Sequence, residues 1–135
     1  MGFFFFATPF WGIIASMILH ITTRKQWEDA RLLGIYKDSS LADEGFIHCS
    51  TQAQILRSAN EYYQGQSNLL LLCISASKVK APILFEDSYQ KGESFPHIYG
   101  SLNLDAVVRE IDFPTNADGT FSLPEDFYSL FQNEK

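Results

Sequence analysis

Two histidines, each followed by a hydroxyl residue, are the residues of this 135-residue chain best suited to chemistry. Thr22 stands two positions after His20, and Ser50 stands two positions after His48. Because residues two apart lie on the same face of a strand, each histidine can form a polar pair with its hydroxyl residue. Two such pairs at neighbouring strand ends, beside helix N-termini, would form a small cleft that favours an anionic group. Alternatively, each hydroxyl caps a helix and each histidine packs or hydrogen-bonds locally.

A third histidine lies in the string Phe95-Pro96-His97-Ile98-Tyr99-Gly100. We expect His97 to converge with His20 and His48 on one cleft, because all three end strands or turns. Phe95 and His97 are candidate ligand contacts. Tyr99, in a turn bounded by proline and glycine, can stack on a ring or fill a corner of the fold.

Charged residues near these strings complete the set of candidates. Glu86 and Glu93 can act as a base or bind a sugar hydroxyl, although a solvated loop carboxylate is the alternative for both. Arg24 or Lys25, at the start of a predicted helix, can contact a phosphate.

Metal binding is a competing interpretation of the same histidines. His20, His48 and His97 can form the three-histidine site of a metal-dependent hydrolase. Thr22 and Ser50 would then have no role, and we therefore assign no metal ligand. Two cysteines cannot form a four-cysteine zinc site or a disulfide-rich scaffold, and both lie in apolar runs, where they are expected to be small core residues.

The overall composition excludes two broad classes of protein. With 10 Lys and Arg against 16 Asp and Glu, the formal charge is −6, so we expect no nucleic-acid partner, because phosphate binding needs clustered cations. With 46% hydrophobic and 15% aromatic residues, the chain can bury a real core, which excludes general disorder.

The apolar pattern predicts an α+β fold with two early helices on a sheet. A first helix is expected from a cap at Thr22 or Thr23 to Leu33, and a second from a cap at Ser50 or Thr51 to Gly65. A polar loop is expected over 37–44, a charged turn over 87–93, and a final short helix opening at 122–125. The predicted strands cover residues 17–22, 45–49, 68–74, 83–86 and 106–113.

The first 16 residues differ from the rest, since residues 1–23 contain no Lys, Arg, Asp or Glu. We divide the chain into an apolar leader outside the fold (1–16), one α+β domain (17–113) and a C-terminal extension (114–135). The leader comes from an upstream start choice, is a membrane anchor or is a secretory signal. We expect a cytoplasmic protein, and a membrane or secreted one only where the leader is retained.

Several of these strings resemble a known family. From Met17 to Phe113 the chain is similar to the bacterial and plant family catalogued as "domain of unknown function 952". The strings that match are Ile18-Leu19-His20-Ile21-Thr22, Gly45-Phe46-Ile47-His48-Cys49-Ser50-Thr51 and Phe95-Pro96-His97-Ile98-Tyr99-Gly100. The resemblance implies an ADP-ribosyltransferase-like fold, a split antiparallel or mixed sheet that binds NAD in the cleft between its halves.

The same resemblance implies roles for individual residues. A first-strand histidine with a following hydroxyl holds the NAD ribose in that group, and a second histidine or aromatic residue lines the nicotinamide pocket. His20 with Thr22 and His48 with Ser50 match these two positions. The third position is usually a glutamate. No motif assigns it here, and the candidates are Glu86, Glu93 and His97.

The leading hypothesis is therefore an enzyme that uses NAD or ADP-ribose, for ADP-ribosyl transfer or for cleavage of the glycosidic bond of NAD. NAD would be a substrate, and no prosthetic group is expected. The partner would be a small nucleotide-like molecule. The alternatives are a non-catalytic module that binds a small ligand or a protein, and the three-histidine hydrolase.

Overall fold

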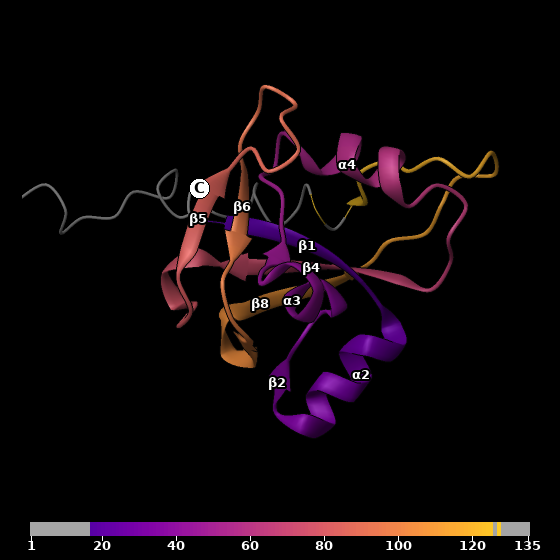
Figure 1. Cartoon of the computed structure of the whole chain (residues 1–135). Coiled ribbons are helices and arrows are strands. Elements are labelled where there is room, and N and C mark those ends of the chain that lie inside the picture. Colours follow the sequence, from indigo (N-terminus) through magenta and orange to yellow (C-terminus); the bar gives the residue numbers. More distant parts are fainter. Residues whose placement is uncertain (1–16, 126, 128–135) are drawn as a thin grey trace, which may run out of the picture.

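A three-stranded antiparallel sheet forms the centre of the computed structural model, which describes residues 17–125 and 127. Its strands lie in the order β1 (Met17–Thr23), β4 (Leu69–Ser75) and β8 (Val107–Asp112) (Figure 1). The sequence predicts all three strands to within one residue at each end.

The middle strand, β4, is buried on both faces, as its continuous apolar sequence predicts. Leu70 and Leu72 pack in one hydrophobic cluster with Trp27, whereas Leu69 and Leu71 pack in a second cluster with Ile55 and its neighbours. Because alternate side chains of a strand point to opposite faces, this single strand contributes to two cores.

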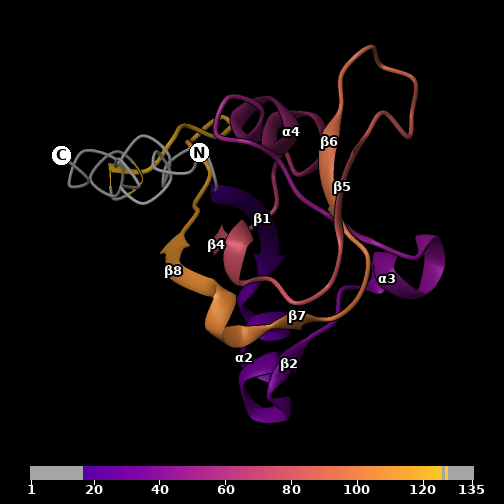
Figure 2. The same cartoon turned by 90° about the vertical axis from the view of Figure 1, so that its left-hand side faces the viewer.

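Two helices cover the opposite faces of this sheet. In Figure 1, α2 (Arg24–Leu33) lies below the sheet and α4 (Ile55–Tyr62) lies above it, and Figure 2 shows the same arrangement from the side. The helix α2 begins as predicted: Thr23 and Gln26 form a reciprocal capping box. It ends at Gly34, whose φ of 92° is a conformation that glycine adopts without strain.

The second predicted helix begins later than expected. Neither Ser50 nor Thr51 caps it, because α4 starts at Ile55 with Gln54 as its N-cap residue. The backbone of Ser50 instead exchanges two hydrogen bonds of 2.8 Å with Leu19 of β1. The chain therefore stays extended through residue 50, and this long-range pairing outweighs the local capping preference.

A second antiparallel sheet stands beside the first, with the order β3 (Ile47–His48), β6 (Phe95–Ile98) and β5 (Ile83–Glu86). The string around His97 is thus a strand, where we expected a turn. A third, two-stranded pair joins β2 (Ile35–Tyr36) to β7 (Leu102–Asn103). Short 3₁₀ turns occupy Ala76–Lys78 and Leu104–Ala106.

The segment expected to be a polar loop contains a short helix, α3 (Ser39–Glu44). Asp38 caps its N-terminus, because the Asp38 side chain accepts a hydrogen bond from the backbone N–H of Ser40. Gly45 ends it with φ of 90°. Asp38 is consequently held at a fixed position beside β3.

The structure describes the first part of the predicted C-terminal extension and none of the predicted leader. Phe121 and Phe127 of the predicted extension are buried in the cluster that also contains Phe113. The predicted leader lies outside the described residues, and most of the predicted final helix does too. Within residues 17–125 and 127, no helix has the length and apolar character needed to cross a membrane.

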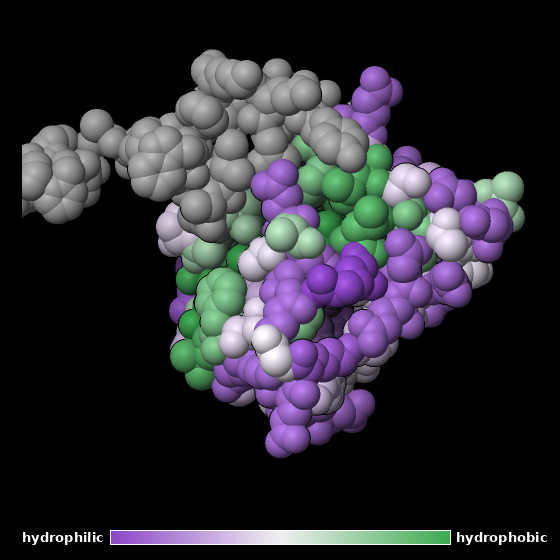
Figure 3. Space-filling model, turned by 90° about the horizontal axis from the view of Figure 1, so that it is seen from above, coloured by the Kyte–Doolittle hydropathy of each residue, from purple (hydrophilic) through white to green (hydrophobic). Residues whose placement is uncertain are grey.

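The surface seen from the α4 side is mixed in character. Hydrophilic residues dominate the lower half of Figure 3, and a hydrophobic area lies at its left edge, on the side of β5. Leu84 and Phe85 are the large exposed hydrophobic residues of that strand.

Candidate functional site

A pocket of about 330 Å³ lies between the end of β3, the middle of β1 and α4. That volume falls in the range of small-molecule sites, roughly 300–1,000 Å³. The lining residues are apolar, aromatic and hydroxyl side chains together with histidine and one carboxylate: Leu19, His20, Ile21, Asp38, His48, Cys49, Ser50, Ile55, Ser58, Tyr62, Tyr63 and Tyr89. A smaller pocket of about 50 Å³ shares part of this lining and adds Phe95, Lys91 and His97.

The three histidines lie next to one another, as expected, but they line two adjoining pockets and not one shared cleft. His20 Nδ1 is 2.5 Å from the backbone oxygen of His48, and the rings of His48 and His97 have centroids 5.3 Å apart. His20 lines the larger pocket, His97 lines the smaller one, and His48 lines both. The bridge between Leu19 and Ser50 holds β1 and the end of β3 together at this point.

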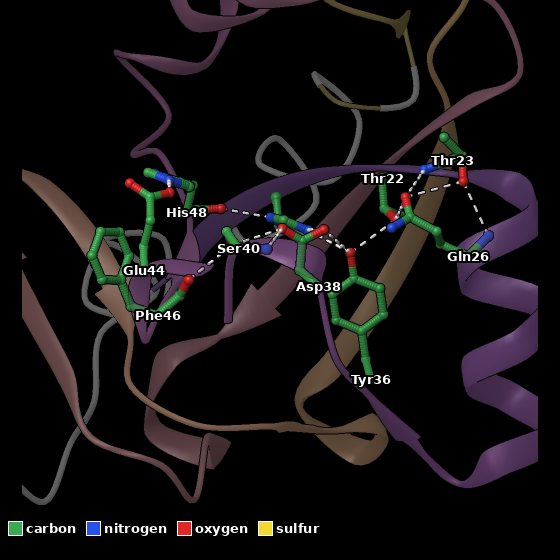
Figure 4. Close-up of polar contacts among 10 residues, drawn as sticks. Thr22, Thr23, Gln26, Tyr36, Asp38, Ser40, Glu44, Phe46 and His48 are labelled. Carbon is green, nitrogen blue, oxygen red and sulfur yellow. Dashed lines mark hydrogen bonds and ion pairs between the residues drawn. The ribbon is translucent and has the colours of Figure 1, made fainter. Parts of the chain in front are cut away.

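A buried hydrogen-bond network runs from the His48 backbone through His20 to the start of α2 (Figure 4). Tyr36, which is 1% exposed, brings its hydroxyl to 2.7 Å from His20 Nε2, 2.9 Å from Thr22 Oγ1 and 3.1 Å from Asp38 Oδ1. His20 and Thr22 thus share a face of β1, as predicted, and both face Tyr36.

The tautomer of His20 follows from these contacts. A carbonyl oxygen only accepts, so Nδ1 carries the proton that is donated to His48. Burial lowers the pKa of His20, while the nearby carboxylate of Asp38 opposes this, and the ring is neutral at pH 7. Its Nε2 therefore accepts from the Tyr36 hydroxyl. That hydroxyl has one proton, so it cannot donate to His20 Nε2 and to Asp38 Oδ1 at the same time.

The electrostatics of the site centre on Asp38. Burial disfavours its charge, but the attraction of a protonated His20, hydrogen bonds from Ser40, and the Tyr36 hydroxyl when His20 is protonated and does not accept from it, outweigh burial, and the pKa of Asp38 lies below its usual value. Asp38 is ionised at neutral pH as a result. Burial, and then the charge of Asp38, raise the pKa of Tyr63, which lines the same pocket.

On the other side of the pocket, His48 is held between a carboxylate and a tyrosine. Its Nε2 is 2.7 Å from Glu44 Oε1, and the hydroxyl of Tyr89 donates to the other oxygen of Glu44 at 2.7 Å. The rings of His48 and Tyr89 are stacked with centroids 5.9 Å apart. Hydrogen bonds from His48 and Tyr89 lower the pKa of Glu44.

Comparison with known proteins identifies the family. Residues 21–110 match the family described as "Protein of unknown function (DUF952)". The chain belongs to this DUF952 family. No curated protein matches it.

Solved structures of one bacterial protein are similar to this chain in sequence and in fold. This DUF952 domain is 30% identical to protein CC0527 from Caulobacter crescentus, whose crystal structure superposes with a TM-score of 0.75 over 83% of this chain and 98% of that one. A double mutant of CC0527 gives a TM-score of 0.74 over the same shares. The solution NMR structure of CC0527 gives 0.66 over 85% of this chain and 98% of that one.

Of the hydroxyl residues expected in the cleft of the DUF952 domain, Ser50 lines the larger pocket and Thr22 lines neither pocket. Ser50 Oγ donates to Ser58 Oγ at 3.3 Å. Thr22 is 2% exposed, and its hydroxyl contacts Tyr36 and Gln26. Thr22 therefore positions Tyr36 in this structure.

The predicted cationic contacts lie on the outer surface of the DUF952 domain. Arg24 pairs with Asp112 at 2.5 Å, and Lys25 pairs with Asp29 at 2.8 Å, four residues along the same helix. Neither cation lines the larger or the smaller pocket.

The two nominated glutamates also have protein partners. Glu86 accepts hydrogen bonds from Tyr99 at 2.6 Å and from His97 Nδ1 at 2.9 Å. Glu93 pairs with Arg57 and accepts from Gln54. Neither glutamate lines the larger or the smaller pocket, and Tyr99 lines neither as well.

His97 is a buried partner of an aromatic cluster. Its ring is 2% exposed and stacks on Phe46 with centroids 4.0 Å apart. With Nδ1 directed to Glu86, His97 presents its remaining surface to the smaller pocket beside Phe95.

The described part of the DUF952 domain, which includes every histidine, contains no group of three His, Cys, Asp or Glu side chains placed to hold a metal ion. His20 directs its two nitrogens to the His48 carbonyl and to Tyr36. This geometry contradicts the three-histidine hydrolase.

Sequence reasoning missed Tyr36 and Asp38, the two residues that complete the network around His20. Each lies in a short element: Tyr36 in the two-residue strand β2 and Asp38 at the cap of α3. The string from Asp38 to Gly45 carries the one usable signal, a capping residue followed by a six-residue segment and a glycine.

Proposed function

We propose that this DUF952 domain binds a small ribosylated molecule of the NAD or ADP-ribose class in the larger pocket and breaks the glycosidic bond of NAD there. The observation that carries the proposal is the meeting of His20, His48 and an ionised Asp38 around one pocket of small-molecule size. Hydroxyl and imidazole groups suit sugar hydroxyls and an amide, and the tyrosines supply faces for stacking.

The ADP-ribosyltransferase-like fold implied by the family resemblance is part of this proposal. It is supported by two antiparallel sheets that adjoin at the pocket, with His20 on a strand of one and His48 on a strand of the other.

In this proposal the carboxylate role passes from Glu86 or Glu93 to Asp38. When the bond between the ribose and nicotinamide breaks, its electron pair leaves with the ring, and the ribose carbon becomes positively charged. A fixed carboxylate stabilises that charge most in a site with little water. Water or another acceptor then adds to the ribose carbon and releases a proton. Asp38 is suited to this role because it lines the pocket and its carboxylate is ionised.

Binding without chemistry is the second candidate, and one observation favours it. Both nitrogens of His20 are used inside the protein, so His20 has no free nitrogen for a ligand unless Tyr36 moves. A non-catalytic ligand-binding module would use the same pocket with His20 as a structural residue.

Calorimetry with NAD and with ADP-ribose, each at millimolar concentration, tests the proposal. We expect dissociation constants between micromolar and millimolar, the range for a few hydrogen bonds and one stacked ring. Ser58→Trp should fill the pocket and abolish binding, whereas the matched control Leu32→Trp, at a site on α2 that is 90% exposed, should not. Absence of heat with both ligands, or undiminished binding by Ser58→Trp, would refute the proposal.

Chromatography of NAD incubated with the protein separates the two candidates. We expect release of free nicotinamide by the natural chain and at least ten-fold less release by Asp38→Asn. Binding of NAD with no nicotinamide release would leave the non-catalytic module as the function.

A further inference from the structure

The charge of the larger pocket comes from one side chain. Among the described residues that line it, Asp38 is the one acidic residue, and none is Lys or Arg. Its side chain is 18% exposed, so the carboxylate reaches the pocket while remaining mostly desolvated. A charge in such a position interacts more strongly with a ligand than a fully solvated charge does.

Asp38 is also incompletely satisfied by the protein. Its Oδ2 accepts from the backbone N–H of Ser40 at 3.3 Å and from the Ser40 hydroxyl at 2.7 Å. Its Oδ1 has the Tyr36 hydroxyl at 3.1 Å, but that proton is shared with His20 Nε2 at the shorter distance of 2.7 Å. When Tyr36 donates to His20, Oδ1 faces the phenol oxygen with no proton between them. A positively charged group in the pocket would compensate the negative charge on Oδ1.

The other ionisable groups nearby do not neutralise the negative charge of Asp38. The His48 ring has Glu44 at 2.7 Å, so any positive charge on it is balanced. Lys91, beside the smaller pocket, pairs with Glu61 at 2.6 Å. Arg57 of α4 pairs with Glu93. The nearest cations are thus matched by carboxylates, and the charge of Asp38 remains.

The walls around Asp38 are suited to a flat cation. Tyr63 lines the same pocket, together with Tyr62 and Tyr89. Lys91 Nζ already lies 4.7 Å from the centre of the Tyr62 ring, and one face of Tyr89 stacks on His48. Tyrosine faces attract cations through their ring electrons, as the contact with Lys91 illustrates. A mostly desolvated carboxylate in a pocket that tyrosines also line is chemistry that recognises a positively charged organic ring or a substituted ammonium group, whereas a phosphate would be repelled.

We propose that the larger pocket takes the cationic part of its ligand, an organic cation such as a pyridinium ring, with Asp38 as its charge partner and the tyrosines as its walls. This inference rests on the proposed function, because it assigns the same pocket. For a dinucleotide, the positively charged ring would enter and the phosphates would remain outside.

Two probes of nearly the same shape test the charge preference: 1-methylnicotinamide, which is a cation, and nicotinamide, which is neutral. Titration of the full chain, followed by NMR, should show about ten-fold tighter binding of the cation, the size expected for one partly desolvated charge pair. Asp38→Asn should reduce this preference to less than about four-fold, the share that the extra methyl group can supply. Asparagine is as good an N-cap as aspartate, so α3 should be kept.

Asp43→Asn is the matched control, because Asp43 is exposed on the same helix and the substitution changes the net charge equally. It should leave the preference unchanged. Equal binding of the two probes, no binding of either, or an unchanged preference in Asp38→Asn would overturn the inference. If NAD and ADP-ribose still bind in those cases, the proposed function stands alone. If neither NAD nor ADP-ribose binds while the cation preference holds, the proposed function is refuted, and the pocket is still assigned to an organic cation.

Discussion

Replacing Tyr36 with phenylalanine removes one oxygen atom from the centre of the buried network and leaves the ring in place. The hydroxyl lies 2.7 Å from His20 Nε2 and 3.1 Å from Asp38 Oδ1, in a side chain that is 1% exposed. After the substitution His20 Nε2, the acceptor of this proton, loses its donor. Because a buried polar group without its partner costs about 1–3 kcal/mol, we expect Tyr36→Phe to lower the free energy of unfolding by about 2–3 kcal/mol.

That loss is large for one atom, since domains of this size are stable by about 5–15 kcal/mol. It corresponds to a fall in Tm of about 6–15 °C, at about 3–5 °C per kcal/mol for a chain of intermediate length. Urea denaturation followed by circular dichroism measures the change directly, and an unaltered denaturant slope would show that the unfolding transition is otherwise the same.

Tyr62→Phe is the control for this experiment. Tyr62 is 52% exposed, and we expect its variant to differ from the natural chain by less than about 0.5 kcal/mol. A loss below about 0.5 kcal/mol for Tyr36→Phe as well would mean that the Tyr36 hydroxyl does not hold the network together, and that His20 Nε2 does not depend on Tyr36 for its hydrogen bond.

Three further outcomes are expected. Because burial lowers the pKa of His20, the unfolded chain binds a proton near pH 6.5 that the folded chain binds only at lower pH. As the pH decreases from 6.5, the free energy of unfolding should therefore decrease by up to about 1.4 kcal/mol per pH unit. Urea titrations at pH 5 to 7 should show a shallower slope for His20→Asn. Arg24→Ala breaks an exposed ion pair with Asp112 and should change neither the free energy of unfolding nor the NAD affinity by more than the error of calorimetry. A ten-fold weaker NAD affinity would instead show that a phosphate of NAD binds at α2. Gly45→Ala should cost about 1 kcal/mol in thermal unfolding, because φ is 90° there, and no loss would show that the end of α3 relaxes freely.

The central sheet was predictable because its signals are local and strong. The run from Leu69 to Ile74 is apolar throughout, and the alternation in 106–113 marks a strand with one buried face. Thr23 and Gln26 likewise carry a complete capping signal within four residues. Patterns of this kind need no knowledge of distant contacts.

The elements that complete the site depend on contacts between distant residues. The strand β2 has two residues and exists because Ile35 and Tyr36 pair with Asn103 and Leu102. The position of Ser50 is likewise set by Leu19, about thirty residues earlier. No local pattern reports such pairings.

The histidines were predictable as a group, and their partners were not. The spacing of His20 and Thr22 correctly implied a shared face, but a spacing cannot show that Tyr36 occupies that face. For the same reason the sequence could not rank Asp38 against Glu86 as the carboxylate of the pocket, since that ranking depends on where α3 packs.

Mapping NAD onto the chain by NMR tests the central claim most directly, that the pocket around His20, His48 and Asp38 is the ligand site. Backbone amide shifts recorded during a titration with NAD should change most at Ser50, at Ser58 to Tyr63, and around Tyr89, and should change least in β7 and the turn that follows it. Shifts that gather around Arg24 or on β5, with the pocket residues unmoved, would contradict that claim.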